Sequence, residues 1–322
     1  MTRALALAWL LAPAATAAGA LDLGSPIVCP EGRTCFIQQY VDRDPGPGAQ
    51  DYTCQGLSYD GHKGTDFALA THAQMAEGVD VIAAAPGVVR GTRDGMADIV
   101  FEARMEATLD GRDCGNGVAI RHENGWETQY CHLRRGSITV RTGDEVARGD
   151  VLGQVGLSGR TQFPHVHISV RDAEGQVVDP FDPDGELSCG APPASDAMLW
   201  TDPPAYVPGA LLDAGFATRV PDYAAVKAGA AREALLPDAP MVLFGYAFGG
   251  RTGDELALRI EGPDGIVVED VSRLDKPQAQ FFRAAGRRSP PGGWAPGDYR
   301  GVVEFRRAGE VIGTRDVPVT LR

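Results

Sequence analysis

The sequence predicts a mainly β protein made of two domains. Most of the chain after residue 56 consists of short apolar runs interrupted by glycines and turn sequences, a texture typical of short β-strands. Only one stretch, 221–236, is convincingly helical, because it begins with a proline and is rich in alanine. The 322 residues are enough for two domains that each bury a core of their own.

The first 20 residues have the features of a secretory signal peptide. Arg3 supplies a positive charge, an apolar run from Ala4 to Ala12 follows it, and residues 18–20 fit a cleavage site. Residues 15–17 are a second candidate for the cut. The apolar run is too short to span a bilayer. We therefore expect an exported protein, periplasmic or secreted, without stable membrane insertion.

The six cysteines agree with export, since all of them follow the signal and none lies in the last third of the chain. An even number in an exported protein indicates disulfides, and sequence alone cannot choose among the pairings that six cysteines allow. We favour Cys29–Cys35 and Cys114–Cys131 as short loops, which leaves Cys54–Cys189 to join the ends of a domain. A zinc site built on cysteines is the rival interpretation, but no Cys-x-x-Cys pair is present.

Residues 21–55 are expected to form a disulfide-containing N-terminal segment with a Pro/Gly-rich loop, and residues 56–190 to form the first β domain. Within that domain "ENG" at 123–125 and "AEG" at 173–175 predict hairpin turns. Four stretches are predicted to contain its strands: 80–92, 115–133, 137–156 and 164–180.

The second domain is expected after a change of texture. Residues 191–240 are predicted to form a Pro-rich linker with the helix 221–236. From residue 241 to 322, alternating runs separated by Gly-containing turns favour a small Ig-like β-sandwich. This domain contains no histidine and no cysteine, so we expect no metal chemistry there.

The charge balance excludes one class of partner. The formal net charge is −13 and the sequence pI is about 4.9, whereas nucleic-acid binding requires a basic stripe. We therefore expect no nucleic-acid partner.

Two of the six histidines lie one residue apart in "PHVHISV". Side chains at i and i+2 of a strand point to the same face, so His165 and His167 project together, while Val166 and Ile168 face the buried side. On its own, this pair fits two histidines on a solvated strand, and the rest of the domain must decide between that interpretation and a functional site.

Earlier in the chain, "HKGTD" brings His62 and Asp66 close together. Imidazole nitrogen and carboxylate oxygen are ligands that zinc accepts, and a catalytic zinc takes three protein ligands and one open position. We expect Gly64 to let the backbone turn so that the two side chains converge. One histidine of the 165/167 pair would complete the set, and the other, with His132 in "YCHL", would be left for proton handling.

With these residues in place, the stretch 56–183 resembles the lysostaphin-like, or LytM-type, zinc metallopeptidases that cut peptide bonds in bacterial cell walls. Four elements occur in the family's order: "HKGTD" at 62–66, "AAAPGVV" at 83–89, "YCHL" at 130–133 and "FPHVHISV" at 163–170. The glycine-rich 143–161 is similar to the family's approach to its His-x-His strand. The resemblance implies an antiparallel sheet of the duplicated hybrid motif type, and it covers none of the C-terminal third.

The resemblance also implies the roles of five residues. His62, Asp66 and His167 would bind one Zn²⁺ per chain, and His132 and His165 would be the catalytic histidines. Zinc lowers the pKa of its bound water toward about 7, which gives the nucleophile for the scissile carbonyl. One histidine would accept a proton and the other would donate to the oxyanion or the leaving amine; which does which stays open.

The chain also departs from the common pattern of the family. Cys131 lies next to His132, and a disulfide to Cys114 would brace the hairpin that carries this histidine. The segment 93–113 is long for a strand connection, and it fits either a loop along the substrate groove or a solvent-exposed excursion. We expect His122 to be structural and His72 to lie on the surface.

Three hypotheses follow for function. The first is an exported zinc metalloendopeptidase that acts on peptidoglycan peptides, with direct D-Ala-type cross-links favoured over glycine bridges in a periplasm. The second is a non-enzymatic regulator that keeps the fold and activates another wall hydrolase; the intact set of five residues argues against it. In the third, the C-terminal domain grips wall glycan or a protein partner.

Overall fold

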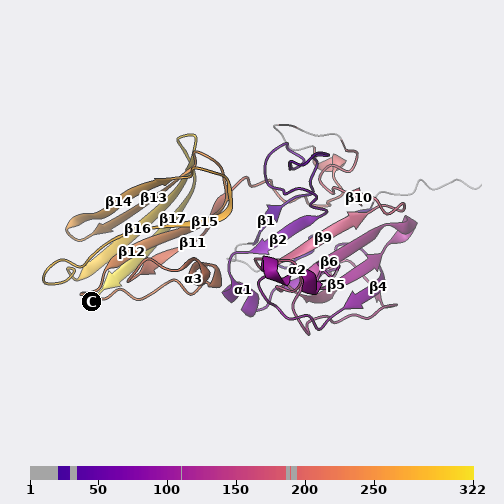
Figure 1. Ribbon diagram of the computed structural model, residues 1–322, viewed down its shortest axis with the longest axis horizontal. Helices are drawn as coiled ribbons and strands as arrows, with labels where there is room; N and C mark the ends of the chain where they lie inside the picture. Colours follow the sequence, from indigo (N-terminus) through magenta and orange to yellow (C-terminus); the bar gives the residue numbers. More distant parts are fainter. Residues whose placement is uncertain (1–20, 30–34, 110, 186–188, 190–193) are drawn as a thin grey trace, which may run out of the picture.

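Two β-rich lobes lie side by side in the computed structural model (Figure 1). The structure describes residues 21–29, 35–109, 111–185, 189 and 194–322, so the predicted signal peptide lies outside the described residues. Strands dominate both lobes, which confirms the prediction of a mainly β protein. None of the helices in the described part of the chain has the length and apolar content that a membrane span requires.

An eight-stranded antiparallel sheet forms the first lobe. Its order is β1-β2-β9-β6-β5-β4-β7, with β10 paired to β9. Since β9 lies between β2 and β6, the predicted site motifs meet in the middle of this sheet. The bounds are β1 Cys35–Gln39, β2 Thr65–Leu69, β4 Gly87–Arg93, β5 Asn116–Arg121, β6 Glu127–Leu133, β7 Glu145–Val146, β9 His165–Arg171 and β10 Val177–Val178.

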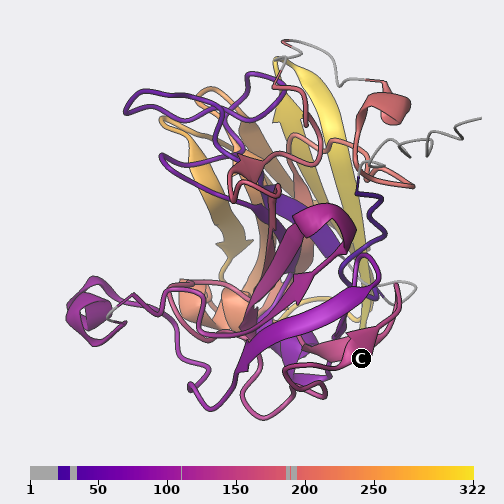
Figure 2. The ribbon, with the colours of Figure 1, turned by 90° about the vertical axis from the view of Figure 1, so that its right-hand side faces the viewer.

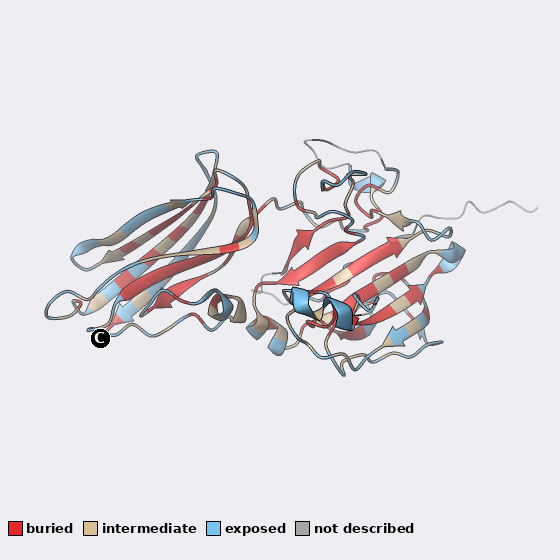
Figure 3. Cartoon of the chain, viewed as in Figure 1, coloured by how far each residue is buried: buried red, intermediate tan, exposed pale blue. Residues whose placement is uncertain are grey.

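A continuous apolar core covers one face of this sheet. A second small sheet, β3 (Asp80–Ile82) paired with β8 (Val151–Gln154), packs there. Leu23 and Trp200, from segments on either side of the domain, are buried in the same core. Figure 3 shows the central strands as largely buried. This packing leaves the opposite face of β2, β6 and β9 to carry polar side chains.

The predicted turns and disulfides are confirmed. β5 and β6 pair across 123–125, where Asn124 and Gly125 have positive φ, and β9 and β10 pair across the turn at Gly175. The three disulfides join Cys29–Cys35, Cys54–Cys189 and Cys114–Cys131.

Two antiparallel sheets form the C-terminal lobe, in the orders β11-β12-β15 and β14-β13-β16-β17. Their facing side chains share one core, in which Leu243 and Phe305 are fully buried. The lobe is thus a β-sandwich, and its assignment as Ig-like stays a prediction. The bounds are β11 Ala210–Ala217, β12 Met241–Gly250, β13 Glu255–Gly262, β14 Gly265–Arg273, β15 Gln278–Arg287, β16 Gly297–Arg307 and β17 Glu310–Leu321.

The helices are short. They are α1 His72–Ala76, α2 Glu106–Leu109 and α3 Tyr223–Ala228, with 3₁₀ turns at Ala103–Met105, Glu123–Gly125 and Ser195–Ala197. The helix expected over 221–236 is therefore too long. It ends at Gly229, which is left-handed, and beyond it the backbone N–H of Glu233 donates to Phe216 in β11. Pairing with a strand overrides the helical propensity of the alanines.

Two expected boundaries also change. β1 lies within 21–55 but pairs with β2, so this segment contributes an edge strand to the main sheet. β11 lies within the expected linker 191–240 but pairs with β12, so the sandwich begins near residue 210. Both strands depend on partners far along the sequence, which local composition does not reveal.

Candidate metal centre

The strand β9 places its two histidines beside Asp66. His167 is paired with Asp66 across β2 and β9, and His165 is paired with Ala68. Both imidazoles lie on one face, while Val166 and Ile168 are fully buried in the core on the other face. The alternation predicted from the sequence is therefore confirmed.

His62 and His167 both direct a ring nitrogen at the carboxylate of Asp66. The distance to Asp66 Oδ1 is 3.2 Å from His62 Nε2 and 2.8 Å from His167 Nδ1. The two ring nitrogens are 3.1 Å apart. The backbone carbonyl of Tyr40 accepts a hydrogen bond from His62 Nδ1 at 2.6 Å, so Nε2 of the neutral ring presents a lone pair to the others.

This donor set fits a divalent metal. One ligand atom from each of His62, Asp66 and His167 lies within 4.8 Å of the others, and the carboxylate is almost fully buried. An anionic carboxylate and lone pairs of two imidazoles converge at one point, and such a group is stabilised by a cation. Two nitrogens and one oxygen are ligands of the kind that zinc takes in catalytic sites.

Gly64 makes room for this arrangement. A Cβ at this position would lie 2.6 Å from His167 Nε2 and 2.5 Å from the carbonyl oxygen of Ile168. The chain bends at Gly64, but its backbone is not left-handed, so φ alone does not require a glycine there. The glycine is needed because the imidazole of His167 approaches the backbone closely.

His132 and His165 lie beside His62, Asp66 and His167, and the centroids of their two rings are 4.7 Å apart. His132 Nδ1 donates to the carbonyl of Ser158 at 2.7 Å. His165 Nδ1 donates to the carbonyl of Phe163 at 3.0 Å and lies 3.1 Å from Thr161 Oγ1. Both rings therefore keep Nε2 for other partners, and Nε2 of His165 is 3.4 Å from Asp66 Oδ1.

Burial and mutual charge set the pKa values of the centre. Burial opposes the ionised carboxylate, but the facing His62 and His165 hold the pKa of Asp66 well below its usual range. Burial also opposes the charge of His62, yet the neighbouring Asp66 carboxylate outweighs it and raises the pKa of His62. Burial, followed by the charges of His165 and His167, holds the pKa of His132 well below its usual range. His132 is therefore a neutral base at neutral pH.

The Cys114–Cys131 disulfide braces the backbone around His132. His132 is one of the few non-glycine residues with positive φ, at 63°. Its backbone N–H donates to the carbonyl of Cys114 at 2.8 Å, beside the disulfide to Cys131. A left-handed backbone in a histidine costs free energy and persists only where neighbouring contacts enforce it. The disulfide and this hydrogen bond supply such contacts.

The segment 93–113 lies partly against the loop before β9 and partly in solvent, and its place along a substrate groove stays a prediction. Its first part lies along the loop before β9, since Phe101 N donates to the carbonyl of Thr161 at 2.8 Å. Arg160 in that loop pairs with Asp113 at 2.9 Å and also with Glu106. The helical turn α2 projects from the lobe and is mostly exposed (Figure 2).

Several contributors to the centre were not foreseen. The Tyr59 ring lies 4.4 Å from the ring of His62 and is 54% exposed, so it borders the centre. Phe163 stacks on His165 at 4.4 Å. The carbonyls of Tyr40 and Ser158 orient two histidines. Backbone acceptors carry no sequence signal, and the two aromatic rings could have been suspected only from their closeness to histidines in the chain.

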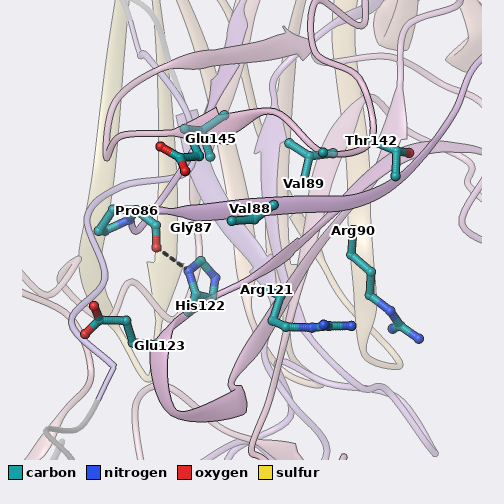
Figure 4. A pocket seen from close by; sticks show the side chains of 12 residues that line it. Pro86, Gly87, Val88, Val89, Arg90, Arg121, His122, Glu123, Thr142 and Glu145 are labelled. Atoms are coloured by element: carbon teal, nitrogen blue, oxygen red, sulfur yellow. Dashed lines mark hydrogen bonds between the residues drawn. The ribbon is translucent and has the colours of Figure 1, made fainter.

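The remaining histidines lie elsewhere. His122 is buried, and its ring nitrogens are 2.7 Å from the Pro86 carbonyl and 2.8 Å from Thr128 Oγ1, as expected of a structural histidine. It borders a cavity of about 720 Å³ beside β4, β5 and β7 (Figure 4). None of the five site residues lines that cavity. His72 is half-buried in α1 rather than on the open surface, because α3 packs against α1.

Comparison with known protein families identifies the part of the chain that carries the centre. Residues 60–180 match the sequence model of peptidase family M23. These residues form an M23 peptidase domain. The matched range contains all five site residues, and it confirms the resemblance to LytM-type enzymes.

Curated relatives match about a third of this chain. The DD-carboxypeptidase/endopeptidase Mpg of Neisseria meningitidis is 39% identical over 107 residues, which is 33% of this chain and 22% of that protein. The peptidoglycan DD-endopeptidase ShyA of Vibrio cholerae is 35% identical over 109 residues, 34% of this chain and 20% of that protein. The chain thus matches about a fifth of the length of these relatives.

One solved structure that is similar to this chain is the catalytic domain of the prophage-encoded M23 protein EnpA from Enterococcus faecalis. It is 27% identical, covers 51% of this chain and 95% of its own, and has a TM-score of 0.32. The catalytic domain of lysostaphin from Staphylococcus simulans is 20% identical, with a TM-score of 0.28.

Proposed function

We propose that the protein is an exported, zinc-dependent metalloendopeptidase that hydrolyses peptide bonds of peptidoglycan. The observation that carries this proposal is the convergence of His62, Asp66 and His167 inside an M23 domain, with two further histidines beside them. Three disulfides support a location outside the cytoplasm.

His62, Asp66 and His167 would hold the zinc ion. When bound, zinc polarises a water molecule and a substrate carbonyl, and so supplies nucleophile and Lewis acid at neutral pH. Asp66 contributes the single negative charge of the set, and the Tyr40 carbonyl fixes the tautomer of His62. The buried surroundings strengthen these electrostatic interactions by excluding water.

His132 and His165 would handle protons at their Nε2 atoms. Their Nδ1 protons are committed to the carbonyls of Ser158 and Phe163, so each ring can accept or donate only at Nε2. One would accept a proton from the attacking water and the other would donate to the oxyanion or the leaving amine. The neutral form of His132 suits it to acceptance.

We further propose that the bond cut is a D,D cross-link between stem peptides. Two similar curated relatives are named a DD-carboxypeptidase/endopeptidase and a peptidoglycan DD-endopeptidase, and an acidic protein with disulfides suits a periplasm, where such cross-links occur. The C-terminal sandwich lies outside residues 60–180, which match the M23 family model, so the proposal rests on the M23 domain.

Digestion of purified sacculi tests the proposal. Wild-type protein should convert cross-linked muropeptides into monomers, as measured by mass analysis of the released peptides. His132→Ala should release none, whereas His122→Ala, which changes a buried histidine outside the centre, should digest like the wild type. Identical profiles for wild type and His132→Ala would favour the regulator hypothesis.

A further inference from the structure

The C-terminal sandwich packs against the edge of the M23 sheet that carries the histidines. Phe36 in β1 pairs with Ala68 in β2, and Ala68 pairs with His165 in β9. Side chains of directly paired residues share one face of a sheet. The side chains of Phe36, Ala68 and His165 therefore form one row across the sheet, which runs from the contact between the lobes to His165.

An apolar cluster fills this contact, and we call it the junction cluster. The ring centroids of Phe36 and Phe248, one from each lobe, are 4.3 Å apart. The first lobe contributes Phe36, Ala68 and Ala70, and the C-terminal part contributes Leu212, Val226, Ala231, Phe244, Tyr246 and Phe248. All of these residues are buried. An apolar contact of this kind restrains the domain motions that a polar contact would permit.

Hydrogen bonds reinforce the junction. Gln38 in β1 donates to the carbonyl of Ala279 at 3.1 Å and accepts from Gln280 Nε2 at 2.9 Å. Gln280 Oε1 in turn accepts from the hydroxyl of Tyr246 at 2.6 Å. A chain of polar groups thus fixes the register between the two lobes.

Phe163 connects this junction to the histidine centre. Its ring packs against the junction cluster. The same ring stacks on His165, with centroids 4.4 Å apart and an interplanar angle of 24°. Its carbonyl accepts the Nδ1 proton of His165 at 3.0 Å. One residue therefore restrains both the plane and the tautomer of that imidazole.

We propose that the C-terminal sandwich is a positioning element for His165 and that it acts through Phe163. The catalytic consequence rests on the proposed function, because proton transfer requires a fixed distance between His165 Nε2 and the reacting atoms. When the junction cluster is disturbed, Phe163 loses its support and His165 samples unproductive orientations. Phe163 is a positioning residue, since its effect on the reaction passes through His165.

Two variants of the full-length, zinc-loaded protein test this coupling. Phe163→Ala removes the stacked ring, and Gln280→Ala loosens the junction from the far lobe without touching the centre. Val303→Ala is the control, because it truncates the core of the sandwich away from the junction cluster. The ring resonances of ¹³C-labelled His165 should move in the first two variants and stay in place in Val303→Ala.

Turnover of a soluble cross-linked muropeptide dimer gives the catalytic readout, measured below the unfolding transition of each variant. The kcat of Phe163→Ala should fall at least about tenfold, and that of Gln280→Ala about threefold. KM and zinc content should stay at wild-type values. Phe163→Tyr keeps the ring and should restore kcat.

The two readouts separate the coupling from the proposed function. Unmoved His165 resonances in Gln280→Ala would overturn the coupling between the sandwich and His165, whatever the protein hydrolyses and whatever Phe163→Ala does. Resonances that move while kcat stays at the wild-type value would overturn the positioning role. If the wild type cleaves no muropeptide, the proposed function fails, and the resonances alone decide whether the sandwich orients His165.

Discussion

Each lobe of the molecule buries an aspartate, and the partners of the two carboxylates differ. In the sandwich, Asp254 is paired through both oxygens with Arg307, at 3.1 Å and 2.7 Å. In the M23 domain, Asp66 faces His62, His165 and His167, and no arginine or lysine pairs with it among the described residues. Arginine is permanently charged, whereas histidine is charged only when protonated. The negative charge of Asp254 is therefore balanced by Arg307. The negative charge of Asp66 can be balanced only by protons on the facing histidines or by a metal ion.

This difference separates a structural carboxylate from a functional one. Both side chains are almost fully buried, so burial alone does not distinguish them. The distinguishing feature is that the partners of Asp66 also direct nitrogen atoms at a common point.

The largest effect is expected for Asp66→Ala. The variant should lose both its bound zinc and its hydrolysis of sacculi, because two neutral imidazoles without the carboxylate hold zinc weakly. Metal analysis of the purified protein measures the zinc, which should be about one ion per chain in the wild type. Zinc content that is unchanged in Asp66→Ala would contradict its assignment as a ligand.

His132→Ala should keep its zinc and lose about 10²–10⁴-fold in kcat, the usual contribution of a general acid or base. His132 is assigned to proton transfer outside the ligand set, so metal binding should not depend on it. Steady-state kinetics on muropeptides and metal analysis of the same sample check both parts. His122→Ala is the matched control, and it should keep its zinc and its kcat.

Asp254→Ala should affect stability alone. Removing one partner of a buried ion pair leaves Arg307 without compensation and should lower the free energy of unfolding by about 3 kcal/mol. Urea denaturation measures this loss. Zinc content and kcat should stay at wild-type values below the unfolding transition, and zinc lost from the folded variant would show that the two lobes do not divide the tasks as described.

Asp179 provides a third buried carboxylate and a pH dependence. Burial, followed by the nearby Asp182 and Asp51, raises its pKa to about 7, against the hydrogen bond from Phe181. Its Oδ2 has no hydrogen-bond partner among the described residues. Between about pH 4 and pH 7 the folded chain keeps a proton that the unfolded chain has released, so stability falls as pH rises through this window.

Asp179→Asn should remove that loss. At pH 8 we expect the variant to be more stable than the wild type by about 2 kcal/mol. The gain comes from removing the buried negative charge, and it is reduced because one N–H of the amide lacks a partner. At pH 4 to 5 the advantage should disappear. Urea unfolding midpoints at the two pH values check this, and an advantage that does not grow with pH would contradict the raised pKa.

Much of the site could be predicted from the sequence, because its residues are carried by local patterns. Strand alternation placed His165 and His167 on one face, and the position of His62 and Asp66 in "HKGTD" suggested a ligand pair. The turn at 123–125 followed from residue type, and the short spacings of Cys29–Cys35 and Cys114–Cys131 favoured the disulfides that the structure has. In these cases the structure depends on residues close together in the sequence, or on the oxidising compartment in which an exported chain forms disulfides.

What the sequence did not reveal depends on contacts between distant segments. β1 and β11 are strands because β2 and β12 offer edges to them, and α3 ends where the chain pairs with β11. The need for a glycine at position 64 arises from the His167 ring, about a hundred residues later. The junction between Phe163 and the sandwich also depends on contacts between distant segments, and only the folded chain brings them together.

His165 and His167 of β9 are assigned different tasks, which single substitutions can separate. Zinc content and kcat should be measured for His165→Ala and His167→Ala in the full chain. We expect His167→Ala to lose both zinc and turnover, and His165→Ala to keep about one zinc ion and lose turnover. Zinc retained in His167→Ala, or lost in His165→Ala, would contradict this assignment.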